Sequence, residues 1–216
     1  MIKAVLFDLD GTLADTAPDL AYALNTLRGS RGMAPLPLEE TRPVTSHGAR
    51  GLLGVGFDIS PGHPDYDALR DEFLACYEAN LCRATVLFPG MPELLSGLEK
   101  RGSPWGVVTN KLERFALPLI ERLELSARAA CVVGGDTTPR SKPHPEPLLA
   151  ASRMIGIEPQ ACLYVGDDRR DIEAGQAAGM RTAVAGWGYL NGNDSDTWGG
   201  DWILAHPGEL LGILEN

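Results

Sequence analysis

The feature that most restricts the fold is an alternation of short apolar runs with segments of helical spacing. The apolar runs are AVLFDLD (4–10), PWGVVTN (104–110), AACVVGG (129–135), ACLYVGD (161–167) and RTAVAG (181–186). Helical spacing follows several of them, at Leu112 to Leu123, Pro145 to Ile155 and Asp171 to Ala178. Strands that alternate with helices indicate a parallel sheet covered on both faces. We therefore predict an α/β protein with a doubly wound, mostly parallel sheet.

Residues 15–83 interrupt this alternation. DLAYALNTLRG (19–29) and YDALRDEFLACYEANL (66–81) have helical spacing, several prolines separate the pieces, and no convincing strand is present. The sequence thus predicts a helical insertion, 15–83, placed directly after the first strand. The remaining residues, 1–14 and 84–216, would form the core domain.

Composition and charge exclude several classes of protein. Hydrophobic residues make up 44% of the chain and charged residues 22%, which is ordinary for a globular protein. The net charge is -10 and the Lys and Arg residues are scattered, so we expect neither nucleic-acid nor membrane partners. The four cysteines form no CxxC pair and acids interrupt the first apolar run, which favours reduced thiols in the cytoplasm without a signal peptide.

The stretch DLDGTL (8–13) places two carboxylates on the same side of an extended segment, where they repel each other. A divalent cation would offset this repulsion, and Mg²⁺ prefers hard oxygen ligands. We expect Asp8, Asp167 and the carbonyl of Asp10 to hold it. Gly11 and Thr12 allow a tight turn whose N–H groups face an anion. An EF-hand is excluded because its sixth position requires glycine and Leu13 stands there.

Four segments in order resemble the motifs of the haloacid-dehalogenase-type phosphatase superfamily. They are DLDGTL (8–13), VVTNK (107–111), SKPHPEP (141–147) and VGDDRRD (165–171), and the insertion is similar to that family's helical cap. The resemblance implies a Rossmann-like core, a small-molecule phosphate ester as substrate and Mg²⁺ as cofactor. It implies that Asp8 is the nucleophile and Asp10 the general acid and base. Thr109 and Lys142 would hold the phosphoryl oxygens, and Asp167 would complete the metal site.

Neighbouring residues receive supporting roles. Asn110 is expected to assist Thr109 at the substrate, whereas Lys111 is left open between phosphate-facing and solvated. Asp168 is expected to cap a helix, because negative charge is favourable at a helix N-terminus. Asp171 is expected in the outer shell of the metal site.

The insertion is expected to select the substrate, with His47 and Arg50 of TSHGARGLL (45–53) as candidate contacts. TAPD, SHGARG, GVVTNK, GDDRRD and AGWGY resemble the phosphoglycolate phosphatase group, within it the branch of N-acetylmuramic acid 6-phosphate phosphatases. Both substrates bear a carboxylate, which Arg50 would bind in a bidentate pair. The choice between the two stays open.

Other interpretations are weighed against this one. Asp10 and Asp167 argue against a dehalogenase, while a sugar phosphomutase and a non-catalytic phosphometabolite-binding regulator stay possible. GWGYLNG (186–192) is only a weak dinucleotide-binding signal, because Trp187 and Tyr189 crowd the place of a pyrophosphate. NGNDSDTWGGD (191–201) is expected to be a polar loop. A monomer and a homodimer are both compatible with the sequence.

Overall fold

A computed structural model describes residues 1–190, 192 and 195–214 of the chain. It divides the chain into two compact units, Met1–Ala14 with Leu87–Asn216 and Asp15–Val86. The chain passes between them at β2 (Ala14–Asp15) and β3 (Val86–Leu87), which form a two-stranded sheet. The inserted unit therefore ends at Val86, three residues after the boundary expected at residue 83.

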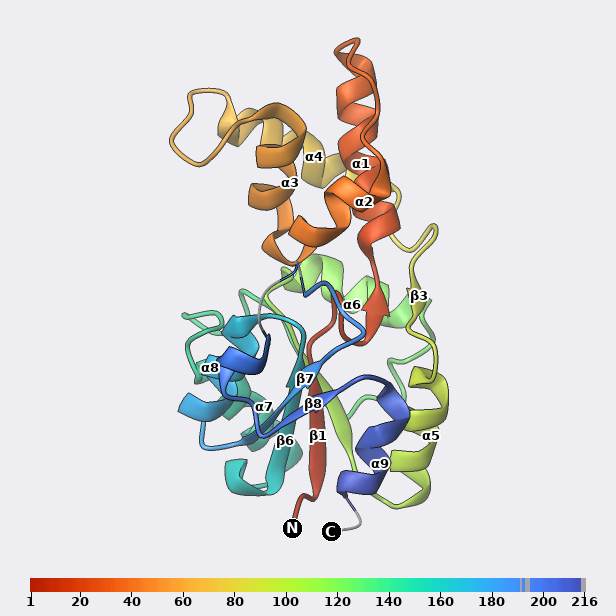
Figure 1. Ribbon diagram of the computed structural model, residues 1–216, viewed down its shortest axis with the longest axis vertical. Coiled ribbons are helices and arrows are strands. Elements are labelled where there is room, and N and C mark those ends of the chain that lie inside the picture. Colours follow the sequence, from red (N-terminus) through yellow and green to blue (C-terminus); the bar gives the residue numbers. More distant parts are fainter. Residues whose placement is uncertain (191, 193–194, 215–216) are drawn as a thin grey trace. The chain divides into compact units, whose positions relative to one another are not determined.

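The larger unit, called the core unit below, contains a six-stranded sheet in the order β5-β4-β1-β6-β7-β8, with every neighbouring pair parallel (Figure 1). Its strands are β1 (Ala4–Phe7), β4 (Trp105–Val108), β5 (Val132–Val133), β6 (Cys162–Gly166), β7 (Arg181–Ala185) and β8 (Trp202–Leu204). The first five lie within the five apolar runs, which confirms the predicted sheet. Strand β8 was not expected.

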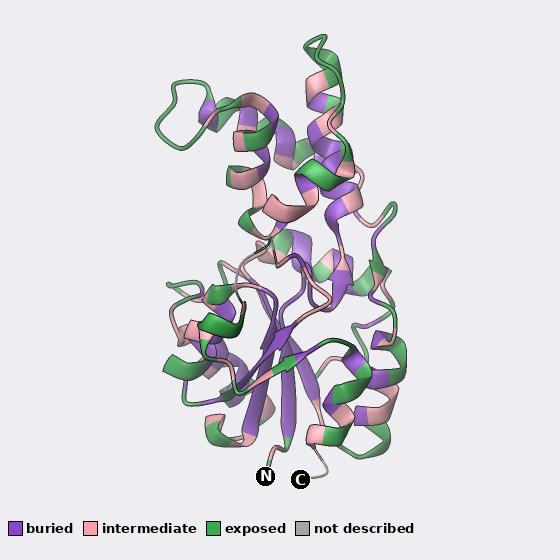
Figure 2. Ribbon diagram, viewed as in Figure 1, coloured by how far each residue is buried: buried purple, intermediate pink, exposed green. Residues whose placement is uncertain are grey.

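Helices cover both faces of this sheet, so its central strands are buried throughout (Figure 2). They are α5 (Met91–Lys100), α6 (Glu113–Arg122), α7 (Glu146–Ile155), α8 (Arg169–Ala177) and α9 (Leu210–Ile213). Alternate residues of β1 and β6, such as Leu6 and Tyr164, pack with Leu148 of α7 and Ala174 of α8 in one apolar cluster. The doubly wound α/β class is confirmed.

The strand order places a topological switch beside β1. From β1 the sheet grows outward through β4 and β5 on one side and through β6 and β7 on the other. Connections that leave two adjacent strands in opposite directions open a crevice at the carboxyl ends of those strands. Asp8 directly follows β1 and Asp167 directly follows β6, so the switch brings them to one place.

The inserted unit is helical, as expected. It contains α1 (Ala17–Ser30), α2 (Leu38–Thr41), the 3-10 helix η1 (Arg42–His47), α3 (Gly48–Phe57) and α4 (Tyr66–Ala79). Helices α1 and α4 confirm the two segments with helical spacing. Leu24, Leu53 and Phe73 are fully buried among these helices and provide the unit with an apolar core of its own.

Two carboxylates near the start of the inserted unit are paired with other residues of that unit. Asp19, at the start of α1, accepts hydrogen bonds from the N–H groups of Ala84 (2.8 Å) and Thr85 (3.0 Å) and from the Thr85 hydroxyl (2.7 Å). Asp15 receives both guanidinium nitrogens of Arg42 at 2.9 Å. Asp19 is buried and Asp15 is partly buried, and carboxylates in such positions are stable when their oxygens are paired in this way.

Further differences from expectation are local. Residues 195–198 of the expected polar loop form a 3-10 helix, η3 (Ser195–Trp198), while positions 191, 193 and 194 lie outside the described residues. Helix α8 begins at Arg169, two residues before the expected start. In the described part of the chain, every helix is too short or too polar to cross a membrane.

Candidate active site

Three carboxylates meet at the switch. Oxygens of Asp8, Asp167 and Asp171 lie within 4.8 Å of one another, and all three side chains are buried. The sheet fixes the backbone position of Asp8. Its N–H donates to the carbonyl of Val165 (2.9 Å), which continues the hydrogen bonding between β1 and β6 past the end of β1. Such crowding of like charges is unfavourable unless a cation or protons neutralise it.

Lys142 supplies one cation to this cluster. Its Nζ lies 2.7 Å from Oδ1 of Asp171 and 2.9 Å from Oδ1 of Asp8, and it donates to the carbonyl of Val108 (3.0 Å) and the hydroxyl of Tyr164 (2.7 Å). An ammonium group has three protons. The Asp8 contact is an ion pair without hydrogen-bond geometry, and Oδ1 of Asp8 accepts no hydrogen bond from the described residues.

Burial dominates the protonation of the cluster. It raises the pKa of the Asp8 carboxyl to about 7, despite the attraction of Lys142, and holds the pKa of Asp167 well above its usual 3.8. At Lys142 burial disfavours the charge, but Asp171 and Asp8 outweigh it and raise the pKa of the ammonium above 10.5. The site therefore holds the Lys142 ammonium beside two carboxyls, those of Asp8 and Asp167, whose raised pKa values favour their protonated forms when no other cation is bound.

Asp167 is held from both sides. Its Oδ1 accepts from the Thr12 hydroxyl (2.7 Å) and its Oδ2 from the N–H of Tyr189 (2.9 Å), in the turn after β7. The indole N–H of Trp187 donates to the Thr12 carbonyl (2.9 Å) and ties this turn to the DLDGTL segment. The GWGY stretch, interpreted above as a weak nucleotide signal, is thus the support of Asp167.

Two glycines make this approach possible. A Cβ on Gly188 would lie 2.3 Å from Cβ of Asp167 and 2.4 Å from the carbonyl oxygen of Gly11. A Cβ on Gly11, whose φ is +88°, would lie 2.2 Å from Oδ2 of Asp167. The N–H of Gly11 donates to the carbonyl of Ala14 (3.0 Å), and the anion contacts expected of Gly11 and Thr12 stay predictions.

The second aspartate of the motif faces another cation. Nζ of Lys111 lies 2.8 Å from Oδ1 of Asp10, and both side chains are largely buried. This places Lys111 at the site rather than in solvent. Thr109, buried at the end of β4, accepts from the N–H of Lys111 through its hydroxyl oxygen (3.1 Å).

The carboxamide of Asn110 contacts the main chain of Lys142. It accepts from the Lys142 N–H and donates to the Lys142 carbonyl, both at 3.0 Å. Asn110 therefore fixes the loop that carries the buried ammonium. Its expected contact with substrate stays a prediction.

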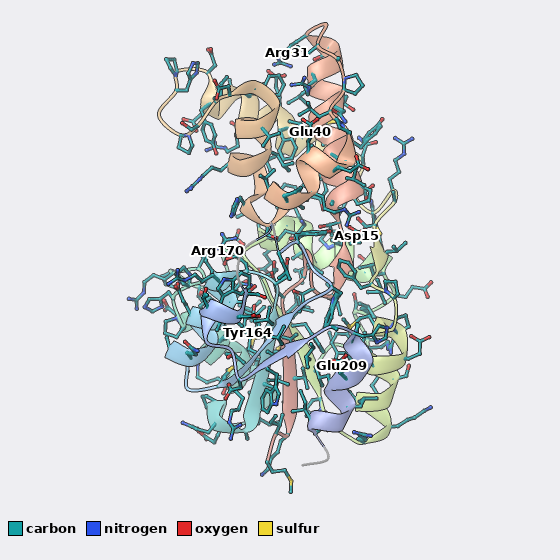
Figure 3. The ribbon with its side chains drawn as sticks, viewed as in Figure 1. Asp15, Arg31, Glu40, Tyr164, Arg170 and Glu209 are labelled. Atoms are coloured by element: carbon teal, nitrogen blue, oxygen red, sulfur yellow. The ribbon has the colours of Figure 1, made fainter. Side chains whose placement is uncertain are left out.

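The start of α8 is capped as expected. Asp168 accepts from the N–H of Arg170 (2.9 Å), and the Asp168 N–H donates to Oδ2 of Asp171 (3.0 Å), which completes a capping box. Arg170 also makes a bidentate ion pair with Asp168, with both contacts at 2.8 Å. Figure 3 labels Arg170 at this helix start and Tyr164 on strand β6. The cap role of Asp168 is confirmed.

The two candidate substrate contacts of the insertion lie on the inserted unit. His47 ends η1, Arg50 belongs to the first turn of α3, and both side chains are exposed. Their roles toward a substrate stay predictions.

Sequence reasoning did not find Tyr164 and the turn at 186–189. Tyr164 reads as an ordinary strand residue, yet its hydroxyl donates to the carbonyl of Val108 (2.7 Å) and accepts from Lys142. Burial, followed by the nearby Asp171, raises the pKa of Tyr164 well above 10. The position of Tyr164 could have indicated its role, because it lies three residues before Asp167 in a strand that was predicted to end at the site.

Comparisons with known proteins identify the family of the chain. The family model described as haloacid dehalogenase-like hydrolase matches residues 5–185. N-acetylmuramic acid 6-phosphate phosphatase of Pseudomonas aeruginosa is 44% identical over 215 residues, covering 99% of this chain and 95% of that protein. Phosphoglycolate phosphatase of Xanthomonas campestris pv. campestris is 44% identical over 212 residues, covering 96% and 94%. The crystal structure of a predicted phosphoglycolate phosphatase from Haemophilus somnus has a TM-score of 0.87 at 27% identity, covering 99% and 98%. The chain belongs to the haloacid dehalogenase-like hydrolase family.

Proposed function

We propose that the protein is a Mg²⁺-dependent phosphomonoesterase that acts through an aspartyl-phosphate on Asp8. The observation that carries the proposal is the buried cluster of Asp8, Asp167 and Asp171 around Lys142 at the topological switch. An oxygen of Asp8 bonds to phosphorus while the ester P–O bond breaks, and Asp10 gives a proton to the leaving oxygen. Water then attacks the phosphorus of this intermediate and Asp10 takes a proton from the water, while the bond between phosphorus and the Asp8 oxygen breaks, so that inorganic phosphate leaves and the Asp8 carboxylate is restored.

The residues present fit a magnesium ion. Asp8 has a buried oxygen that accepts no hydrogen bond from the described residues, and a second carboxylate, Asp167, lies beside it. Asp8, Asp167 and the main-chain carbonyl of Asp10 would hold the ion. Asp171, already engaged by Lys142 and the Asp168 N–H, would lie outside the direct ligands. The ion would neutralise charge on the phosphoryl oxygens.

Metal-free protein is expected to lose stability as pH rises from about 4 to about 7. Over this window Asp8 keeps its proton in the folded chain, because its pKa is about 7, whereas the unfolded chain has released it near 3.8. Each pH unit then lowers the free energy of unfolding by about 1.4 kcal/mol for such a group. Thermal melting with a chelator is expected to give a lower Tm at about pH 8 than at about pH 5, restored at pH 8 by Mg²⁺.

Asp8→Asn is the matched control for this experiment, since it removes the titrating carboxyl and keeps its shape. Its metal-free Tm should fall less between the two pH values than that of the wild-type protein. Equal Tm changes in the two proteins, or no response of the wild type to Mg²⁺, would contradict the prediction.

Gly188→Ala is expected to weaken Mg²⁺ binding about 10- to 100-fold, the usual effect of disturbing the groups that orient a metal ligand. The new Cβ would collide with Asp167 and with the backbone of Gly11. Isothermal titration with Mg²⁺ measures the affinity directly. Gly54→Ala on α3 is the control, because its Cβ would meet nothing within 4 Å. Wild-type affinity in Gly188→Ala would show that the turn does not position Asp167.

We propose a small carboxylate-bearing phosphate ester as the substrate, of the phosphoglycolate type. The support is that relatives of 44% identity are named for phosphoglycolate and, alternatively, for N-acetylmuramic acid 6-phosphate, and both compounds carry a carboxylate. His47 and Arg50 of the inserted unit would contact the substrate. The cytoplasm is the proposed location, in line with four cysteines that form no disulfide.

A panel of phosphate esters tests the function. Purified protein with Mg²⁺ is expected to release phosphate from p-nitrophenyl phosphate, and faster from phosphoglycolate or N-acetylmuramic acid 6-phosphate. A chelator should stop the release. Transfer of phosphate between sugar positions without free phosphate would favour a phosphomutase, and binding without turnover would favour a regulator.

A further inference from the structure

The ammonium of Lys111 occupies a built position beside Asp10. The main chain beneath it is held on both sides, because the Lys111 N–H donates to the Thr109 hydroxyl (3.1 Å) and its carbonyl accepts from the N–H of Gly135 (2.8 Å). The side chain is only 7% exposed, and Nζ lies 2.8 Å from Oδ1 of Asp10. A charged group that is buried and anchored in this way has a defined place in the site.

We propose that Lys111 determines substrate specificity by binding an anionic group attached one carbon away from the scissile ester oxygen. The inference rests on the proposed function, in which Asp10 touches the leaving oxygen. A group on the carbon next to that oxygen then lies beside the carboxyl of Asp10 and within reach of the ammonium that contacts it. A largely desolvated cation strongly favours an anion over a neutral group at this place.

The two substrates named by the relatives differ in this respect. In phosphoglycolate a single methylene separates the ester oxygen from the carboxylate. In N-acetylmuramic acid 6-phosphate the ester is on the exocyclic carbon 6, whereas the carboxylate belongs to a lactyl group on a ring carbon, several bonds away from the ester oxygen. Lys111 therefore favours the phosphoglycolate type, and it does so from the core unit, independently of the proposed contact by Arg50.

The matched comparison is between phosphoglycolate and 2-hydroxyethyl phosphate, which replaces the carboxylate by an alcohol of similar size. Wild-type protein is expected to prefer phosphoglycolate in kcat/KM. Lys111→Met is expected to reduce this preference by about 10- to 100-fold, the equivalent of one lost charged hydrogen bond, mainly through a higher KM for phosphoglycolate. Lys111→Arg keeps the charge and should retain a preference for the carboxylate.

A role limited to positioning Asp10 would act on every substrate alike. If Lys111→Met slows phosphoglycolate, 2-hydroxyethyl phosphate and p-nitrophenyl phosphate by one common factor, the proposal is wrong. It is equally wrong if the wild-type protein shows no preference between the first two. If Lys111→Met has a much lower Tm than the wild-type protein, Lys111→Gln is used to repeat the test. Failure of the wild type to hydrolyse any of the three, and also N-acetylmuramic acid 6-phosphate, would instead reject the proposed function.

Discussion

Asp8→Asn is expected to reduce phosphate release by roughly 10⁴-fold or more, as removal of a catalytic nucleophile does in other enzymes. The carboxamide has the same shape but is a poor nucleophile. Folding should not suffer, because the substitution removes a buried carboxyl whose pKa burial has already raised to about 7. Rates measured with p-nitrophenyl phosphate at saturating Mg²⁺, together with the Tm, separate lost chemistry from lost structure.

Asp58→Asn provides a control for the same chemical change. Asp58 is exposed and ends α3 in a left-handed conformation, with φ of 57°, that asparagine adopts readily. This variant should keep wild-type rates. Activity of Asp8→Asn within tenfold of the wild type would rule out the aspartyl-phosphate mechanism.

Lys142→Met is expected to lower both stability and activity. Loss of the ammonium leaves Asp8 and Asp171 without their shared cation, and breaking a buried ion pair in this way costs about 3–5 kcal/mol. For a chain of this size that is a fall in Tm of roughly 6–20 °C. Phosphate release should fall with it, because the positive charge beside the phosphoryl position is lost.

The pH dependence of the Lys142→Met effect distinguishes charge from packing. At about pH 5 the carboxyls of the variant can take up protons, so its deficit in Tm should be smaller than at about pH 8. Lys100→Met, at an exposed position near the end of α5, should leave the Tm nearly unchanged. An equal deficit at both pH values would indicate that only the packing of the side chain matters.

The sheet could be predicted because parallel strands that are buried on both faces have uninterrupted apolar sequences, such as CLYVG in β6. Strand β8 escaped because it is a short edge strand in which Trp202 is half-buried and Ile203 is exposed, so it lacks that signature. The helix cap of Asp168 was predictable for a similar reason. Its partners, Arg170 and Asp171, stand within three residues of it in the sequence.

The carboxylates of the site could be predicted because strand ends of a parallel sheet converge. Their supports could not, because they depend on contacts between distant segments. Trp187 binds the carbonyl of Thr12 across 175 residues, and Tyr189 reaches Asp167 through a main-chain N–H that carries no sequence signal. Lys111 was left open for the same reason. Only folding shows that its side chain meets Asp10, 101 residues earlier in the chain.

The bonds from Asp19 to Ala84 and Thr85 have a consequence for how such a chain can change over time. They join the entry and the exit of the inserted unit by contacts made entirely within that unit. A segment whose two ends are fastened to each other can be replaced by another of similar end-to-end spacing without altering the register of the host sheet. Recombination would therefore exchange the inserted unit as a single cassette, while the catalytic residues of the core unit are inherited unchanged.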